Sequence, residues 1–508
     1  RNKLSLAIES SKKQHIGPYK LFIEGKSVET SRKLDSLNPS DESLVGSFYL
    51  ATEVEAEKAV KSALKALPEW SKTSVEKRAS LLEALADKIL ERRFELIALE
   101  IREVGKTWSE ADADITEAVD FCRYYAREMR RLDQPHRVGA VLGEVSMYHY
   151  RARGVSLVIA PWNFPLAILT GLVTSSLVTG NTVVMKPAEQ STITAAVLMD
   201  MIIEVGFPSE VVQFLPGIGE EVGEYLVNHS EIATIAFTGS KNVGLGIVQK
   251  AAKTKSGQTQ VKKCVIEMGG KNAIIVDNDA DLDVAIDGIL YSCFAFAGQK
   301  CSACSRIIVV GDIYERFMER FLDSANSLLQ DKASNPKAYA GPVIDEESKN
   351  RVLEFLDKIS DKNKIAFQAE VPDQGFFVPF TIVTEVEPQD EIANTELFAP
   401  VVAILKAENI DEALKIANGT EYALTGGLFS RSPANIDKVR EEFEVGNLYI
   451  NRSCTGALVD RHPFGGYKMS GVGSKAGGPD YLLQFMNPRV VTENTMRQGF
   501  APPENDSE

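Results

Sequence analysis

The chain has few of the residues that build disulfides, metal sites or nucleic-acid surfaces. Its 508 residues include six cysteines and five histidines. So few cysteines form no disulfide framework, and no second C-x-x-C or paired histidines complete a zinc site. Acidic residues outnumber basic ones by 71 to 56, giving a net charge of −15 that argues against nucleic acid. These absences favour a cytoplasmic enzyme that acts on a small molecule and uses no metal.

Charge is missing altogether from residues 154–185. A stretch of this length could cross a membrane as a helix. However, Pro161, Pro165, Gly171 and Gly180 interrupt it. We therefore expect a buried strand, loop, helix and strand here, and no membrane span.

The two ends of the chain carry little pattern. Residues 1–13 are mixed polar and apolar and do not form a signal peptide. Because the chain begins with Arg rather than Met, we expect a trimmed protein or one piece of a longer polypeptide. Residues 501–508 are polar and acidic, so we expect them to be disordered.

The first half of the chain alternates short apolar runs with helical patterns, after two helices predicted at 53–68 and 75–102. The predicted strands are 155–160, 182–185, 211–215, 234–237 and 264–267. The predicted helices between them are 166–179, 191–205, 219–228 and 241–252. This alternation predicts a parallel sheet wound with helices, which is typical of a nucleotide-binding domain.

A second alternating region follows. We expect strands at 273–276, 305–310, 375–386 and 401–407, and helices near 281–297, 312–329 and 410–417. A further strand-like segment spans residues 487–493. With 508 residues, the chain is long enough for two or three α/β domains.

Three segments of the first region could bind a nucleotide. Gly217-Ile-Gly219-Glu-Glu-Val-Gly223 is one residue too long for G-x-G-x-x-G, so a helix-start turn fits it better. Phe237-Thr238-Gly239-Ser240, followed by Gly244, opens a helix and could face a pyrophosphate, although Ser240 could equally be a helix cap. Lys186-Pro-Ala-Glu189 ends a strand where a ribose would lie, or is a solvated turn.

The most informative chemical group is Cys301, in Gly298-Gln-Lys-Cys301-Ser-Ala-Cys304. A thiol attacks as its thiolate and needs a base or a lowered pKa. Glu267, in Glu267-Met-Gly269-Gly270-Lys271, offers a carboxylate for proton transfer. Asn163 could donate a hydrogen bond to a developing oxyanion, or could cap the next helix. We interpret Cys304, Cys122, Cys264 and Cys293 as buried structural residues.

Taken together, these segments resemble the aldehyde dehydrogenase superfamily over nearly the whole chain. The motifs that carry the resemblance are Pro161-Trp-Asn-Phe, Lys186-Pro-Ala-Glu, Phe237-Thr-Gly-Ser, Glu267-Met-Gly-Gly-Lys, Gly298-Gln-Lys-Cys, Glu396-Leu-Phe-Ala-Pro and Pro463-Phe-Gly-Gly. One departure is Ala399, where many members have Gly. We expect it to affect loop shape more than chemistry.

Within the superfamily, Cys301-Ser-Ala-Cys304-Ser-Arg306 and Ser453-Cys-Thr-Gly456-Ala457 resemble the 1-pyrroline-5-carboxylate dehydrogenase group. The resemblance implies oxidation of L-glutamate γ-semialdehyde to glutamate, as in proline catabolism. It implies that Ser302, Gly456 and Ala457 hold the amino-acid end of the substrate. Phe164 and Phe464 would pack on its methylenes.

The same resemblance implies a mechanism and a cofactor. Cys301 would attack the aldehyde, Asn163 would stabilise the oxyanion, and Glu267 would activate water to release the product. The implied cofactor is NAD, with Glu396 on the nicotinamide ribose. Further implied cofactor residues are Pro161, Trp162, Lys186, Glu189, Gly219, Gly223, Phe237, Thr238, Gly239, Ser240, Gly244, Gly269 and Phe398.

The family fold divides the chain. It implies a Rossmann-type NAD-binding domain at 1–138 and 154–266, and an α/β catalytic domain at 267–465. A β-hairpin oligomerisation arm and tail would occupy 139–153 and 484–498, giving a homodimer or higher homo-oligomer. The group also exists fused to a proline dehydrogenase. Two alternatives stay open: a dehydrogenase for another semialdehyde such as succinate semialdehyde, and a non-catalytic protein that kept the fold.

Overall fold

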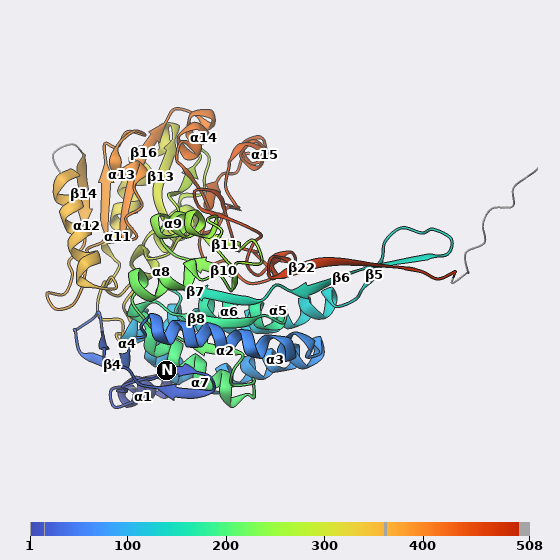
Figure 1. Cartoon of the computed structure of the whole chain (residues 1–508). Coiled ribbons are helices and arrows are strands. Elements are labelled where there is room, and N and C mark those ends of the chain that lie inside the picture. The colour runs from blue at the N-terminus through green and yellow to red at the C-terminus, as the bar shows by residue number, and fades with distance from the viewer. Residues whose placement is uncertain (1, 15, 360–362, 497–508) are drawn as a thin grey trace, which may run out of the picture.

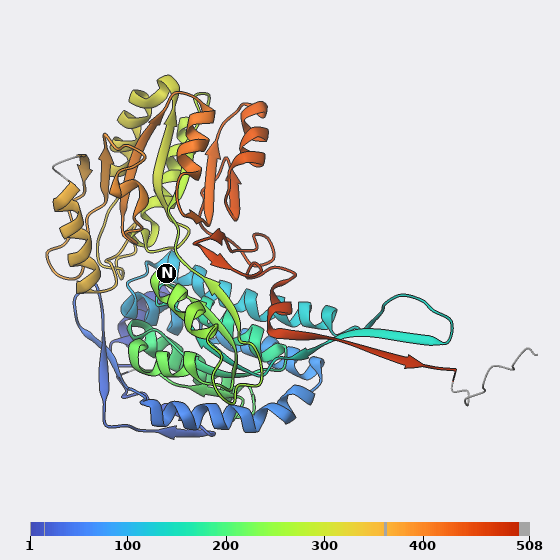
Figure 2. The same cartoon turned by 45° about the horizontal axis from the view of Figure 1, so that its top comes forward.

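Two α/β sheets and a projecting β arm build the molecule (Figures 1 and 2). The computed structural model describes residues 2–14, 16–359 and 363–496. The α/β fold expected from the alternating patterns is confirmed, and each sheet has its own hydrophobic packing.

The first sheet has eight strands within the described chain, in the order β2-β1-β9-β8-β7-β10-β11-β21. These strands are β1 (Leu21–Ile23), β2 (Lys26–Val28), β7 (Val155–Ile159), β8 (Thr182–Lys186), β9 (Val212–Phe214), β10 (Ile232–Thr238), β11 (Lys263–Glu267) and β21 (Gly471–Val472). The five strands from β9 to β11 run parallel. All five were predicted to within two residues, because each is an apolar run between turn residues.

Helices cover this sheet and extend toward the arm (Figure 2). They are α1 (Asn2–Ser11), α2 (Glu53–Lys72), α3 (Val75–Glu91), α4 (Arg93–Glu103), α5 (Trp108–Leu132), α6 (Ala167–Val178), α7 (Thr192–Glu204), α8 (Glu224–Asn228) and α9 (Lys241–Ala251). The predicted helix 75–102 is two helices, because the chain turns at Arg92 (φ −94°, ψ 12°). The predicted helix 219–228 begins with a π turn, Gly219–Gly223.

The apolar stretch 154–185 is folded into this unit. It forms β7, α6 and β8, and α6 is buried on every side. No helix in the part of the chain that the structure describes combines the length and the hydropathy needed to cross a bilayer.

The second sheet has seven strands in the described chain, in the order β14-β15-β16-β13-β12-β18-β19. They are β12 (Asn272–Val276), β13 (Cys304–Val310), β14 (Lys364–Gln368), β15 (Thr381–Thr384), β16 (Val401–Ala407), β18 (Thr425–Phe429) and β19 (Asn447–Ile450). Its helices are α10 (Leu282–Phe294), α11 (Tyr314–Asn326), α12 (Glu346–Ile359), α13 (Glu391–Asn394), α14 (Ile410–Asn418) and α15 (Pro433–Glu442).

Three expectations for this region were wrong at their boundaries. The helix expected near 312–329 is Tyr314–Asn326. The strand expected at 375–386 is paired only at 381–384. Pro379, which has no N–H for a strand ladder, lies just before it, and Gly375 has a positive φ of 95°. The helix expected to reach 297 ends at Phe294, because Phe296 and Ala297 both have a φ of 52°.

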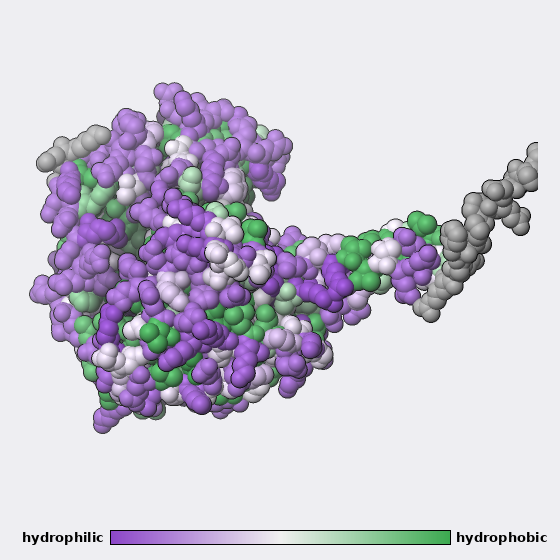
Figure 3. Space-filling model, viewed as in Figure 1, coloured by the Kyte–Doolittle hydropathy of each residue, from purple (hydrophilic) through white to green (hydrophobic). Residues whose placement is uncertain are grey.

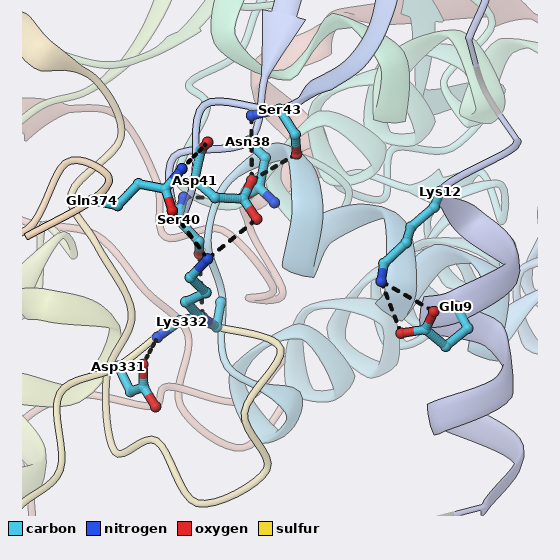
Figure 4. A network of polar contacts seen from close by, with 10 residues as sticks. Glu9, Lys12, Asn38, Ser40, Asp41, Ser43, Asp331, Lys332 and Gln374 are labelled. Carbon is cyan, nitrogen blue, oxygen red and sulfur yellow. Dashed lines mark hydrogen bonds and ion pairs between the residues drawn. The ribbon is translucent and has the colours of Figure 1, made fainter. Parts of the chain in front are cut away.

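Short elements complete the chain. They are β3 (Lys33–Leu37), β4 (Leu44–Tyr49), β17 (Tyr422–Ala423), β20 (Tyr467–Lys468) and the short helices Glu189–Ser191, Ala295–Gly298, Gly311–Ile313 and Tyr481–Phe485. The loop between β3 and β4 joins the two halves (Figure 4). Asp41 Oδ2 lies 3.6 Å from Lys332 Nζ, and the Asp41 carbonyl accepts a hydrogen bond from Gln374 Nε2 at 3.1 Å. The β3–β4 loop is therefore tied to the half of the molecule that contains the second sheet.

The arm consists of β5 (His136–Arg137), β6 (Glu144–Ala152) and β22 (Met486–Asn494). β6 and β22 pair antiparallel from Met486 opposite Ala152 to Asn494 opposite Glu144. The strand-like segment expected at 487–493 is confirmed, because it lies within β22. The end of the predicted tail, 497–498, and the acidic segment 501–508 lie outside the described residues. The division into domains stays a prediction.

Candidate active site

A cavity of about 430 Å³ lies where the two sheets, α5 and α6 meet. It brings together residues that the sequence predicted from distant motifs. The predicted residues that line it are Phe164, Phe237, Thr238, Glu267, Cys301, Ser302, Gly456, Ala457 and Phe464. The nucleophile, the carboxylate and the expected substrate residues therefore face one space.

The segment before Cys301 is held in an unusual backbone conformation. Phe296, Ala297 and Gly298 follow one another with φ of 52°, 52° and 66°. A Cβ on Gly298 would lie 2.4 Å from the Ala399 carbonyl oxygen, so only glycine fits. Ala399 faces Gly298 through its backbone carbonyl and not through its side chain. Alanine therefore fits at this position, where many family members have Gly.

Asn272, which the sequence reasoning missed, fixes the Cys301 loop from the second sheet. Its Nδ2 donates hydrogen bonds to the carbonyl oxygens of Cys301 at 2.7 Å and Ala303 at 2.8 Å. Its Oδ1 accepts one from the Thr425 amide at 2.9 Å. Its position two residues beyond the Gly269-Gly270 pair was the only signal in the sequence.

Burial keeps the reactive thiol protonated. It raises the pKa of Cys301 well above its ordinary range, and the neighbouring Glu267 carboxylate raises it further. Burial likewise raises the pKa of Glu267 to about 8. Glu267 Oε1 has no hydrogen-bond partner among the described residues. The site thus presents a neutral thiol beside a group able to take its proton, rather than a pre-formed thiolate.

Asn163 reaches the Cys301 loop from the other sheet. It is buried, and its Nδ2 donates to the Gln299 carbonyl oxygen at 3.0 Å. Gln299 is itself fixed: its Oε1 accepts from the Ile344 amide at 2.8 Å. An amide nitrogen has two hydrogens, so Asn163 keeps one donor beyond this contact. The predicted alternative, a cap on the next helix, is wrong, because Leu166 precedes α6 without a side-chain cap.

The expected substrate anchors also come together. Ser302 Oγ lies 2.6 Å from Thr455 Oγ1, which joins the Cys301 loop to the Gly456-Ala457 segment. Gly456 has a positive φ of 75°, which favours glycine. Both Phe164 and Phe464 contribute to the cavity wall.

A buried ion pair lines the cavity and was not predicted. Lys300 Nζ lies 2.6 Å from Glu110 Oε2, and the Tyr291 hydroxyl donates to Glu110 Oε1 at 3.1 Å. Although burial pushes the pKa of Glu110 upward, Lys300 brings it below its usual value. Lys300 adjoins Cys301, but nothing local marked Glu110.

Four predicted cofactor residues meet at the carboxyl end of β8. Lys186 Nζ lies 3.3 Å from Glu189 Oε1, and the Gly219 amide donates to the same oxygen at 2.9 Å. A Cβ on Gly223 would lie 3.5 Å from Lys186 Cε. The 217–223 segment therefore starts a helix, as the spacing suggested, and also packs against the Lys186–Glu189 pair.

At the start of α9, the sequence left open whether Ser240 caps the helix. Ser240 Oγ accepts a hydrogen bond from the Val243 amide at 3.5 Å, so Ser240 caps the helix. Gly239 packs on the Phe237 ring, and a Cβ on Gly244 would lie 2.6 Å from Met268 Sδ. Gly244 thus has a packing role, while the free amides of this helix start could still face an anion.

Glu396 rests on two glycines of the Glu267 motif. The Gly270 amide donates to Glu396 Oε1 at 2.9 Å, and a Cβ on Gly269 would lie 1.9 Å from Glu396 Oε2. Nearby, the Phe398 ring meets Trp162 edge-on at 5.7 Å between centroids. Pro161 precedes Trp162 in the same half-buried turn.

The remaining cysteines are free. Cys122, Cys293 and Cys304 are buried, as expected, whereas Cys264, near the start of β11, is only half-buried and packs against the edge of a hydrophobic cluster. Among the described residues, no three His, Cys, Asp or Glu side chains are grouped to hold a metal ion.

Comparison with known proteins agrees with this geometry. The aldehyde dehydrogenase family model matches residues 26–491. A 1-pyrroline-5-carboxylate dehydrogenase of Geobacillus sp. (strain WCH70) is 45% identical over 94% of this chain and 93% of its own length.

Two solved structures are similar over nearly the whole chain. A 1-pyrroline-5-carboxylate dehydrogenase from Thermus with bound NAD has a TM-score of 0.95 at 42% identity, covering 97% of this chain and 96% of its own. Proline utilization A (PutA) from Bdellovibrio bacteriovorus has a TM-score of 0.97 at 56% identity, over 99% of this chain. The chain spans about half, 53%, of that PutA chain. By its sequence and its fold, the chain belongs to the aldehyde dehydrogenase family.

Proposed function

We propose that the protein oxidises L-glutamate γ-semialdehyde, which forms from 1-pyrroline-5-carboxylate, to L-glutamate with NAD. The observation that carries this proposal is the shared cavity: Cys301, Glu267 and the Ser302–Thr455 contact beside Gly456-Ala457 line the same space. Two of the relatives described above, which are 45% and 42% identical to this chain, are named 1-pyrroline-5-carboxylate dehydrogenase. The reaction would serve proline catabolism.

The cavity suits a short amino acid with an aldehyde at its far end. Hydroxyl and backbone groups at Ser302, Gly456 and Ala457 would take the amino-acid carboxylate. Phe164 and Phe464 would pack against the methylenes, which brings the aldehyde carbon to Cys301. Polar ends and an apolar middle match the polar and aromatic parts of the wall.

The proposed chemistry uses Cys301, Asn163 and Glu267 in turn. The thiol gives its proton to Glu267 and attacks the aldehyde carbon, and the oxygen becomes an oxyanion. The Asn163 amide and the Cys301 backbone N–H stabilise that oxyanion; one such donor contributes about 3–4 kcal/mol in comparable sites. Loss of hydride leaves a thioester on Cys301. Glu267 releases the thiol's proton to solvent and then takes a proton from the water that hydrolyses the thioester.

The residues expected to hold NAD form a fitting cradle. When bound, NAD accepts the hydride. Glu189 and Lys186 would hold the adenosine ribose, and Glu396 the nicotinamide ribose. The close approach of Glu396 to Gly269, where a Cβ would collide, supports this assignment, since the carboxylate is held beside the catalytic loop. Trp162, Phe237, Thr238, Gly239, Ser240, Gly244 and Phe398 would complete the site.

The decisive experiment measures NADH formation with three substrates: 1-pyrroline-5-carboxylate, succinate semialdehyde and propionaldehyde. We expect kcat/KM to be highest for 1-pyrroline-5-carboxylate by at least tenfold. Folded protein that prefers succinate semialdehyde would support the alternative, in which Lys300 leaves Glu110 to bind a lone carboxylate. A preference for propionaldehyde would refute both the proposed substrate and the succinate semialdehyde alternative.

We further propose a homodimer or higher homo-oligomer built through the arm. The arm extends away from the body, and apolar side chains gather near its tip (Figure 3). These include Val141 and Leu142, which are 66% and 96% exposed. β19 is an edge strand of the second sheet, which a partner's arm could extend. Light scattering of wild-type protein and of a variant lacking residues 139–143 would test this assembly.

We also propose that the domain ranges given above hold, and that the enzyme acts in the cytoplasm. The free cysteines fit a reducing compartment. Because a PutA is among the similar structures, the enzyme is proposed to work with a proline dehydrogenase, either separate or fused. The encoded reading frame around this chain would distinguish these two arrangements.

A further inference from the structure

Lys106 is a completely buried lysine that lies outside the lining of the active-site cavity. It belongs to the connection between α4 and α5. Its Nζ lies 4.1 Å from the centre of the Phe164 ring and 5.3 Å from that of Phe296. Phe164 belongs to the loop that carries Asn163, and Phe296 to the segment that leads to Cys301. One ammonium group therefore touches both loops that hold the reacting groups.

The charge of Lys106 is balanced on the same side. Its Nζ lies 3.3 Å from Asp114 Oδ1 and 3.8 Å from Glu100 Oε2, and both acids are fully buried. Burial raises the pKa of Glu100 well above its ordinary value, and Asp114 raises it further, so Glu100 keeps its proton. Asp114 is therefore the nearer acidic partner of Lys106.

Asp114 carries the contact back to the same loop. Its Oδ2 accepts a hydrogen bond from the Leu166 amide at 3.2 Å. Lys106 and Asp114 therefore contact the 161–166 loop at two points. The Lys106 ammonium lies over the Phe164 ring, and the Asp114 carboxylate accepts the hydrogen bond from Leu166. Asn163 directly precedes Phe164 in the chain, so it is next to the first of these two contacts.

We propose that Lys106 is a positioning residue that sets the Asn163 amide and the Phe164 ring relative to Cys301. Cation–π attraction is strongest where water is excluded, as it is at Lys106. This assignment rests on the proposed roles of Asn163 and Cys301, but not on the identity of the substrate. Lys106 acts through these residues and does not itself touch the substrate.

The test compares two reactions of the Cys301 thiol that differ in one requirement. Alkylation by iodoacetamide forms no oxyanion, whereas acylation by p-nitrophenyl acetate passes through one and so needs Asn163. In Lys106→Met, we expect acylation and the dehydrogenase kcat to fall together, by at least tenfold. Alkylation should stay within twofold of wild type.

Two further variants protect the test against misfolding. Lys106→Met with Asp114→Asn removes both charges, and the Asn side chain still accepts from the Leu166 amide. We expect this double variant to fold and to show the same selective loss. Glu100→Gln is the matched control: it sits in the same cluster, is already neutral and makes no aligned hydrogen bond, so its kinetics should equal wild type.

Unchanged acylation in the folded double variant would overturn the proposal. Equal losses of acylation and alkylation would also overturn it, because Lys106 would then act on the thiol or on the fold and not on Asn163. If wild-type protein acylates normally but does not oxidise 1-pyrroline-5-carboxylate, the proposed substrate fails while the role of Lys106 stands.

Discussion

The carboxylates on the two sides of Cys301 are held by different means. On the cofactor side, Glu396 accepts a hydrogen bond from the Gly270 amide at 2.9 Å. Glu189 accepts one from the Gly219 amide at 2.9 Å through the same oxygen that lies 3.3 Å from Lys186 Nζ. On the substrate side, Glu110 pairs with the buried ammonium of Lys300 at 2.6 Å. The first arrangement anchors a carboxylate while most of its acceptor sites stay free for hydroxyl groups. The second neutralises a carboxylate inside the cavity wall.

This difference suits what each side is proposed to bind. Ribose hydroxyls are neutral donors, and an anchored carboxylate with free lone pairs accepts from them. An amino acid carries charges of both signs. Because Lys300 and Glu110 in the cavity wall already pair with each other, the wall does not favour a ligand of either net charge. Substitutions on either side should therefore separate the KM for NAD from the KM for the aldehyde.

The largest effect is expected at the point where the two sides meet. Cys301→Ala removes the attacking atom, so we expect dehydrogenase activity to fall by about a thousandfold or more, as for other catalytic nucleophiles. Binding on both sides should survive, because alanine leaves the loop contacts of Asn272 in place. NADH formation gives the loss, and fluorescence titration with NAD gives the retained affinity. Substantial turnover would contradict the assigned nucleophile.

Glu267→Gln should slow both steps in which Glu267 takes a proton, attack by the Cys301 thiol and hydrolysis of the thioester. Without the base, hydrolysis of the thioester slows by about 10²–10⁴-fold. Rapid mixing should then show NADH forming slowly from the first turnover, without a burst. A burst of one NADH per active site at the wild-type rate would show that Glu267 acts only in hydrolysis of the thioester.

The raised pKa of Glu267 also predicts two pH dependences. The base must be ionised, so wild-type kcat should rise with pH through about 8. The folded state holds a proton that the unfolded state loses near pH 4.5. Stability from this group is therefore lost as pH rises from about 4.5 to about 8. Glu267→Gln should abolish the kcat limb, and its Tm advantage over wild type should grow across this interval.

Gly269→Ala tests the cofactor side alone. The new Cβ would collide with the Glu396 carboxylate, which would move away and lose its hydrogen bond from the Gly270 amide. Loss of a hydrogen bond to a charged group costs about 1.5–3 kcal/mol, so we expect the KM for NAD to rise about tenfold to a hundredfold. The KM for the aldehyde should change little. Gly246→Ala, where a Cβ meets nothing within 4 Å, is the matched control.

The two sides also differ in how far the sequence predicted them. Glu189, Glu396 and their glycines lie in short motifs. The parallel strands β8 and β11, which precede Glu189 and the Gly269-Gly270 pair, follow from apolar runs. Glu110 and Lys106 lie in or beside α5, where a polar residue on a helix is ordinarily solvated. Their burial follows only from packing α5 against α6 and the Cys301 loop, which is long-range information. Asn272 was missed for a similar reason, since its partners lie 29, 31 and 153 residues away in the chain.

Ser302→Ala tests the substrate side with the smallest expected change. The variant loses the hydroxyl that meets Thr455 Oγ1 and the proposed donor to the substrate carboxylate. We expect the KM for 1-pyrroline-5-carboxylate to rise about tenfold, the value of one hydrogen bond to a charged group. Propionaldehyde has no carboxylate, so its kinetics should stay unchanged, as should the KM for NAD. Thr455→Val separates the two roles of Ser302: it breaks the Ser302–Thr455 contact but leaves the serine donor in place. If Thr455→Val raises this KM as much as Ser302→Ala does, Ser302 acts by holding the Gly456-Ala457 segment and not by binding the substrate.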